Sequence, residues 1–199
     1  MKILIVEDNE DSRNLLSKQL RSYGHEVITA NNGIEALEQA LKDAPDIVVS
    51  DIQMPEMDGF QLCRQWKQNE KLKYIPVVFY TATYTSQEDE KFALNLGVNA
   101  FVRKPTDPGV LAKILSEIIE QAGAGLLPPP IVESLGQDEY LEEYNKRLVA
   151  KLQKKIEDLN LEISRRKKAE SDIRRIGRML RTISECNQLL VHATDEKEL

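Results

Sequence analysis

The chain is poor in the residues that build metal sites and disulfide frameworks, with two cysteines and two histidines among 199 residues. Cys63 and Cys186 lie far apart and neither has a metal-ligand spacing, so we expect reduced thiols in a reducing compartment. Long apolar runs are also lacking, since none approaches the roughly 20 residues that span a bilayer. An acidic pair, Glu7 and Asp8, arrives too early for a signal peptide. We therefore predict a cytoplasmic protein without membrane contact.

Nucleotide-binding signatures are missing as well. The sequence contains no glycine-rich phosphate-binding motif, and neither histidine suits the phosphoacceptor of a histidine kinase. His25 follows Gly24 just before a predicted strand and is interpreted as structural, and His192 lacks the acidic neighbour that such a phosphoacceptor has. The chain is therefore not predicted to be an enzyme that phosphorylates itself from ATP.

The composition that remains is globular, and its charge is distributed unevenly. Apolar residues make up 41% of the chain and charged residues 30%, which argues against disorder. Residues 1–122 carry 19 acidic and 13 basic side chains, whereas residues 144–181 carry 13 basic and 5 acidic ones. The basic segment leaves nucleic acid open as a partner, although a solvated charged face is the usual meaning of such a run.

Five short apolar runs alternate with five stretches of helical periodicity in residues 1–122. The apolar runs are continuous rather than alternating, as is typical of parallel strands covered on both faces. The sequence therefore predicts an α/β fold with a five-stranded, doubly wound parallel sheet. The predicted strands are residues 2–6, 27–28, 47–49, 77–80 and 100–102, and the predicted helices are residues 12–23, 34–42, 58–68, 86–96 and 107–121.

The remaining residues divide into a predicted linker and a predicted coiled coil. Residues 123–136 are rich in glycine and proline and include three consecutive prolines, which favour an extended segment. Residues 137–185 contain no proline and one glycine, and their apolar positions recur about every 3.5 residues. A lone helix of this length and polarity is poorly supported in water. We expect a parallel homodimer, and a helix packed back on the first domain is the alternative.

Polar and charged residues stand where four of the five predicted strands end. Glu7 and Asp8 follow the first strand, Asp51 the third, Thr81 the fourth and Lys104 the fifth. Because parallel strands end at one edge of their sheet, and ligands bind outside that edge, we expect these side chains to lie close together.

This combination of residue types favours phosphoryl-transfer chemistry. Clustered carboxylates repel one another unless a cation such as Mg²⁺ lies between them. Lys104 supplies a compact positive charge for a phosphoryl oxygen, and Thr81 supplies a hydroxyl donor. Each residue has a plain structural explanation when it is taken alone, such as a turn at Asp51 or a strand exit at Lys104. The set at one sheet edge favours a site, with Asp51 as the nucleophile.

The residues up to about 122 resemble the receiver domain of two-component response regulators. The resemblance implies a flavodoxin-like fold and a role in phosphorelay signal transduction, and it covers roughly three fifths of the chain. It rests on the order and spacing of four motifs, which are ILIVEDN at 3–9, DIQMPEMDG at 51–59, YTA at 80–82 and VRKP at 102–105.

The resemblance assigns a phosphoacceptor and a metal site. Asp51 would accept a phosphoryl group from the phosphohistidine of a histidine kinase or a phosphotransfer protein. Mg²⁺ would be held by Glu7, Asp8 and Asp51, with Asp8 the more direct of the first two ligands. The backbone carbonyl of Gln53 would complete the metal site.

The resemblance also assigns a switch. Lys104 would contact the phosphoryl group, and Thr81 would move toward it after transfer. Phe101 occupies the aromatic switch position and would turn inward as Thr81 moves, which would reposition the predicted helix 86–96 and the strand after it. The peptide bond between Lys104 and Pro105 is expected to be cis, as is usual in the family.

The C-terminal residues resemble signalling modules of larger proteins. The segment ISRRKKAESDIRRI at 163–176 is similar to helical linkers that join receivers to sensor or kinase modules. Residues 186–199 resemble the start of a GAF-like domain, and a helical tail is the alternative. We therefore expect the N-terminal part of a larger protein, such as a hybrid sensor histidine kinase.

Two other classes of function are compatible with parts of the sequence. Haloacid dehalogenases also combine an aspartyl nucleophile with Mg²⁺, but they need a second aspartate two residues on, where Gln53 stands. A receiver with a nucleic-acid-binding helical output would use the basic residues of 165–181 as its contact. Those residues fall mostly on solvent positions of the heptads, so pairing of two helices is the favoured interpretation.

Overall fold

The computed structural model describes residues 1–127 and 136–195, without the side chains of Gln137 and of residues 181–195. It forms two compact units, Met1–Tyr140 and Leu141–Leu199. Most of the predicted linker, and the end of the predicted GAF-like segment, lie outside the described residues. The domain boundaries inferred from the sequence therefore stay a prediction.

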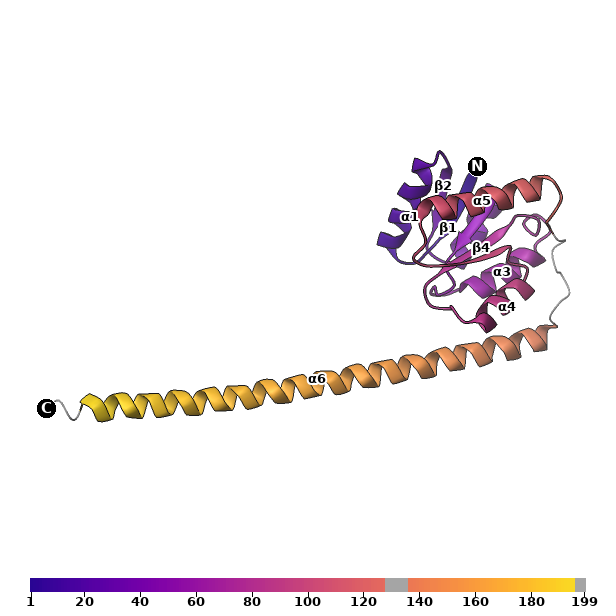
Figure 1. Ribbon diagram of the computed structural model, residues 1–199. Coiled ribbons are helices and arrows are strands. Elements are labelled where there is room, and N and C mark those ends of the chain that lie inside the picture. The colour runs from indigo at the N-terminus through magenta and orange to yellow at the C-terminus, as the bar shows by residue number, and fades with distance from the viewer. Residues whose placement is uncertain (128–135, 196–199) are drawn as a thin grey trace. The chain divides into compact units, whose positions relative to one another are not determined.

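The first unit contains the predicted parallel sheet, with strand order β2-β1-β3-β4-β5 (Figure 1). Every neighbouring pair is parallel, which confirms the predicted α/β fold. Each observed strand lies within two residues of its predicted bounds. The strands are β1 Lys2–Val6, β2 Glu26–Ala30, β3 Ile47–Ser50, β4 Val77–Thr81 and β5 Ala100–Arg103.

Five helices follow the five strands and cover both faces of the sheet (Figure 1). Each begins after a residue whose side chain accepts a hydrogen bond from a free backbone N–H of the first turn, which explains why the helices begin where they do. These capping residues are Asn9, Asn32, Asp58, Ser86 and Asp107. The helices are α1 Glu10–Ser22, α2 Gly33–Lys42, α3 Gly59–Gln68, α4 Gln87–Asn95 and α5 Pro108–Gly123.

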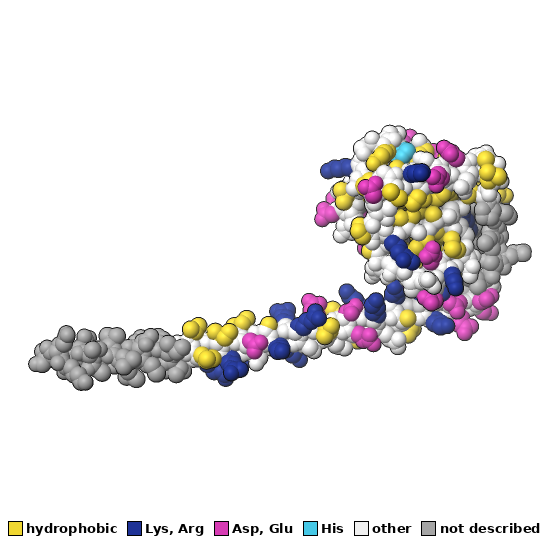
Figure 2. All heavy atoms as spheres, viewed as in Figure 1, with side chains coloured by type: hydrophobic (Ala, Val, Ile, Leu, Met, Phe, Trp, Pro, Cys, Tyr) yellow, Lys and Arg dark blue, Asp and Glu magenta, His cyan; other side chains and the backbone are white. Residues whose placement is uncertain are grey.

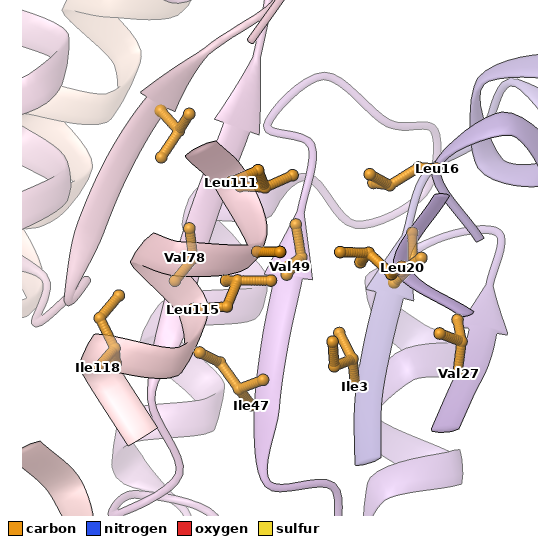
Figure 3. Close-up of a cluster of buried hydrophobic side chains, with 13 residues drawn as sticks. Ile3, Leu16, Leu20, Val27, Ile47, Val49, Val78, Leu111, Leu115 and Ile118 are labelled. Carbon is orange, nitrogen blue, oxygen red and sulfur yellow. The ribbon is translucent and has the colours of Figure 1, made fainter. Parts of the chain in front are cut away.

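The hydrophobic core holds the strand ends in fixed positions. On one face of the sheet, Ile3, Val49 and Val78 pack with Leu20 of α1 and Leu115 of α5 (Figure 3). Alternate residues of the same strands are also fully buried, which explains the continuous apolar runs in the sequence. Close packing on both faces leaves the carboxyl ends of the strands as a rigid platform.

One long helix, α6 Gln137–Asp195, confirms that the predicted coiled-coil segment is helical. The helix passes Gly177 without interruption and continues through residues 186–195, where a new domain or a tail was expected. Figure 2 shows apolar side chains among charges of both signs along its described part. Pairing with a second helix stays a prediction. None of the described helices combines the length and apolar character that a membrane span requires.

Candidate functional site

The sheet brings the predicted site residues to one edge. Val6 pairs with Ser50 in the β1–β3 register, and Thr81 pairs with Arg103 in the β4–β5 register. The residues that follow these pairs, Glu7 and Asp51 on one side and Lys104 on the other, therefore lie at the same edge of the sheet. There, Lys104 contacts two of the other predicted residues, Glu7 and Asp51.

Lys104 is the centre of this cluster. Its ammonium donates a hydrogen bond to Asp51 Oδ2 at 2.8 Å and a second one to Glu7 Oε2. The three side chains are mostly buried, with 19% of Lys104, 12% of Asp51 and 7% of Glu7 exposed. The ammonium also lies 5.2 Å from the ring centroid of Tyr80. One buried cation thus compensates two carboxylates, and together the three side chains keep a negative charge at the strand ends.

Burial and pairing act in opposite directions on the ionisation of this cluster. Burial raises the pKa of the Glu7 carboxyl, against the opposing effect of the Lys104 ammonium. Burial alone would lower the pKa of Lys104, but the hydrogen bonds to Asp51 and Glu7 and their charges outweigh it and leave that pKa raised. Lys104 therefore keeps its proton at neutral pH, and the anionic form of Glu7 depends on a nearby cation.

The Asp51 carboxylate is oriented by its own loop. Its Oδ1 accepts hydrogen bonds from the backbone N–H groups of Ile52 at 2.6 Å and Gln53 at 3.4 Å, while Oδ2 faces Lys104. The Asp51 backbone N–H donates to the Val6 carbonyl at 2.8 Å, which ties the loop to β1. A carboxylate fixed in this way is positioned in advance for reaction with a bound group.

Gly59 ends the motif at 51–59 and was assigned no role from the sequence, yet the structure makes it part of the site's support. Its position at the start of α3 leaves no room for a side chain, because a Cβ atom would lie 2.5 Å from the Asp51 carbonyl oxygen. Its N–H donates to the Ile52 carbonyl at 2.8 Å. The signals in the sequence were its place in the motif at 51–59 and its position directly after the capping residue Asp58.

Thr81 and Phe101 occupy the expected strands, but neither is hydrogen-bonded to Asp51 among the described side chains. Thr81 is fully buried, and its hydroxyl lies 3.3 Å from Thr83 Oγ1. Among the described side chains, no hydrogen bond joins it to Asp51. The Phe101 ring packs edge-on against Phe79, with centroids 6.4 Å apart. The Lys104–Pro105 peptide bond is cis, as predicted.

Asp8 and Gln53, the other predicted metal ligands, are exposed to solvent in the loops that follow β1 and β3. Arg13 fixes the loop that carries Asp8, since its guanidinium donates to the carbonyl oxygens of Glu7 at 2.7 Å and Asp8 at 3.3 Å. The sequence did not single out Arg13. In the part of the chain that the structure describes, no three His, Cys, Asp or Glu side chains form a group that could hold a metal ion.

Comparisons with known proteins agree with this architecture. Residues 3–116 match the response regulator receiver domain family. An uncharacterized 14.6 kDa protein of Leptolyngbya boryana is 38% identical over 117 residues, which is 59% of this chain and 88% of that protein. The alkaline phosphatase synthesis transcriptional regulatory protein PhoP of Bacillus subtilis is 38% identical over 107 residues, 54% of this chain and 43% of PhoP.

A solved structure shows the same fold. The chemotaxis response regulator CheY4 of Vibrio cholerae superposes with a TM-score of 0.55 at 33% identity. The superposition covers 59% of this chain and 97% of CheY4.

Proposed function

Because the chain belongs to the response regulator receiver domain family, we propose that Asp51 accepts a phosphoryl group from the phosphohistidine of a partner histidine kinase or phosphotransfer protein. Receiver domains are the phosphoacceptors of two-component signalling. The observation that carries the proposal is the contact of Lys104 with both Asp51 and Glu7 at the strand edge. This contact places the positive charge of Lys104 beside the Asp51 carboxylate, which is the group proposed to react.

In the proposed step, a carboxylate oxygen of Asp51 attacks the phosphorus atom. A bond forms between that oxygen and phosphorus while the bond from phosphorus to the donor's imidazole nitrogen breaks. The leaving imidazole nitrogen keeps the electron pair and takes a proton from solvent water, so the donor histidine ends as a neutral imidazole. Lys104 stabilises the negative charge of the transferred phosphoryl oxygens, and the Ile52 N–H keeps the carboxylate oriented through the reaction.

The donor set at this edge suits Mg²⁺. This ion prefers oxygen ligands and is commonly held by one or two carboxylates together with water and phosphate oxygens, so a ready-made cage of three side chains is not required. Glu7, Asp8 and Asp51 would hold it with the Gln53 carbonyl. When bound, Mg²⁺ would supply positive charge that offsets the negative charge of the carboxylates and of the incoming phosphoryl group. The raised pKa of buried Glu7 is consistent with a carboxylate that needs such a cation.

Removal of the metal tests this proposal. The full chain, mixed with an acyl phosphate donor and Mg²⁺, is expected to take up one phosphoryl group at Asp51, as measured by intact-protein mass spectrometry. A chelator should lower the rate by at least about 100-fold, because the phosphoryl charge then lacks its main compensation. Equal rates with and without the chelator would remove Mg²⁺ from the proposal.

The arrival of the phosphoryl group supplies the driving force for the proposed switch. It adds a charge of about −1.5 to −2 and strong acceptor oxygens next to Lys104. The Thr81 hydroxyl, whose nearest described partner is Thr83, then has a better acceptor to turn toward. Phe101 fills the space that Thr81 leaves, and α4 and β5 form the face that changes.

We also propose that α6 pairs with a second copy of this chain. Leu152, Ile156, Leu159 and Ile163 alternate at spacings of four and three residues, and each is 45–57% exposed in the single chain. Such a stripe forms the seam of a two-stranded coiled coil. Leu161 lies off the seam, because two residues along a helix correspond to a rotation of about 200°.

Two single substitutions separate pairing from helix stability. Leu159→Lys is expected to weaken the dimer by about 100-fold or more, since two buried leucines are lost per dimer. Leu161→Lys introduces the same residue two positions away and should leave the dimer nearly unchanged. Sedimentation equilibrium measures both dissociation constants. A wild-type chain that stays monomeric, or equal effects of the two variants, would contradict this seam.

A further inference from the structure

Tyr140 is a buried aromatic residue in the first turn of α6, and it belongs to the first compact unit. It is 4% exposed, whereas the adjacent Leu141 is 42% exposed. Its ring stacks on Phe92 of α4, with centroids 6.0 Å apart and an interplanar angle of 19°. The Arg64 guanidinium of α3 lies 4.0 Å from the centre of the Tyr140 ring. The start of α6 is therefore held by a ring contact and a cation–π contact.

The Tyr140 side chain acts as a neutral ring in this position. Burial raises the pKa of its hydroxyl to about 12. The phenol therefore stays protonated at physiological pH, and titration of the hydroxyl does not control the contact. The stacking on Phe92 and the contact with Arg64 hold the ring, and a phenylalanine would keep both of these ring contacts.

A series of aromatic ring contacts joins Phe92 to Phe101, which lies on β5 near the edge of the sheet that carries Asp51. Phe60 of α3 packs edge-on against Phe92 at 5.1 Å and against Phe79 of β4 at 5.6 Å. Phe79 in turn contacts Phe101 of β5 at 6.4 Å. The five rings thus form an aromatic chain from the proposed switch residue Phe101 to Tyr140.

The aromatic chain has little freedom to absorb a displacement. Phe60, Phe79 and Phe92 are between 0% and 3% exposed. Closely packed side chains move between discrete arrangements and transmit a shift to their neighbours. Phe92 lies on α4 and Phe101 lies on β5, so both elements of the face that is proposed to change carry a ring of the chain.

We propose that Tyr140 is the contact through which the state of Asp51 reaches α6. In the unphosphorylated protein its ring, held by Phe92 and Arg64, fixes the first turn of α6 on α4. When Phe101 turns and α4 shifts, the ring contact is lost and that turn is released. This inference rests on the proposed function for its trigger, and the contact itself is independent of phosphorylation.

Hydrogen exchange of the amides at residues 141–144 tests the contact in the full chain. Tyr140→Ala is expected to speed exchange there by about tenfold, because a stacked pair and a cation–π contact are lost together. Tyr140→Phe keeps both ring contacts and should exchange at a rate closer to the wild type than to Tyr140→Ala. Tyr74→Ala removes a tyrosine that is 70% exposed and serves as the matched control. Unchanged exchange in Tyr140→Ala would overturn the inference.

Phosphorylation and a double-mutant cycle then test the coupling. Phosphorylated wild type should exchange at the rate of Tyr140→Ala, and phosphorylation should add little to that variant. Exchange that stays slow although Asp51 carries phosphate overturns the inference and leaves the proposed function intact. If Asp51 takes up no phosphate, the proposed function fails. In that case a double-mutant cycle tests the coupling: exchange at residues 141–144 is measured in Phe101→Leu, in Tyr140→Ala and in the double variant. Non-additive effects on the exchange rate support the coupling between Phe101 and Tyr140, and additive effects overturn it.

Discussion

Replacing Asp51 by asparagine is expected to abolish phosphoryl uptake, with a loss of at least about 1,000-fold that leaves no modified protein in the mass spectrum. The amide cannot act as the nucleophile, and it removes one of the two negative charges that Lys104 compensates. The fold should survive. An amide oxygen can accept the hydrogen bond that the Ile52 N–H now donates to Asp51 Oδ1, so Asp51→Asn should retain the circular dichroism spectrum of the wild type.

The matched control for this variant is Asp46→Asn. Asp46 precedes β3, whereas Asp51 follows it, so the two residues lie at opposite ends of one strand. The Asp46 carboxylate accepts the Lys2 backbone N–H at 2.6 Å, which an amide oxygen can also do. Phosphoryl uptake should be unaffected in Asp46→Asn. Uptake that persists in Asp51→Asn would assign the acceptor to another residue and refute the proposed function.

Gly59→Ala is expected to destabilise the first unit by about 2–4 kcal/mol. The added Cβ would lie 2.5 Å from the Asp51 carbonyl oxygen and 2.8 Å from the Ile52 Cα. Both are backbone atoms that cannot rotate away, so either α3 or the loop carrying Asp51 must move. Because that loop orients Asp51, the proposed phosphoacceptor, phosphoryl uptake should fall together with stability.

Urea unfolding followed by tryptophan fluorescence measures this effect. Trp66 is the single tryptophan of the chain and is fully buried in the first unit, so the signal reports that unit. Gly123→Ala is the control, since a Cβ there meets nothing within 4 Å and alanine favours a helix. Its midpoint should equal that of the wild type or lie slightly higher. Equal midpoints for both variants would contradict the close approach at Gly59.

Much of the fold could be predicted because its signals are local. Continuous apolar runs indicated strands buried on both faces, and the observed strands lie within two residues of those runs. The carboxyl ends of parallel strands share one edge, so residue order along the chain was enough to group Glu7, Asp51 and Lys104. The hydrogen bonds that Lys104 donates to Glu7 and Asp51 show that these three residues do lie together.

The roles of other residues depended on contacts that no local pattern reports. Gly59 differs from other glycines only through the backbone that faces it. Tyr140 lies next to Leu141 at the edge of a periodic apolar pattern, and periodicity cannot tell which of two adjacent residues is buried. Thr81 was expected at the strand edge, but its hydroxyl faces Thr83 rather than Asp51.

The sequence by itself thus determined the strands, the long helix and Asp51 as the candidate phosphoacceptor, because spacing and residue type encode backbone geometry and chemistry. Tertiary structure decided that Lys104 is shared between Asp51 and Glu7, and that Phe101 and Tyr140 are the ends of one aromatic chain. These contacts join residues that are far apart in the chain, and their distances follow from how helices pack on the sheet. That packing is a property of the whole core and of no single segment.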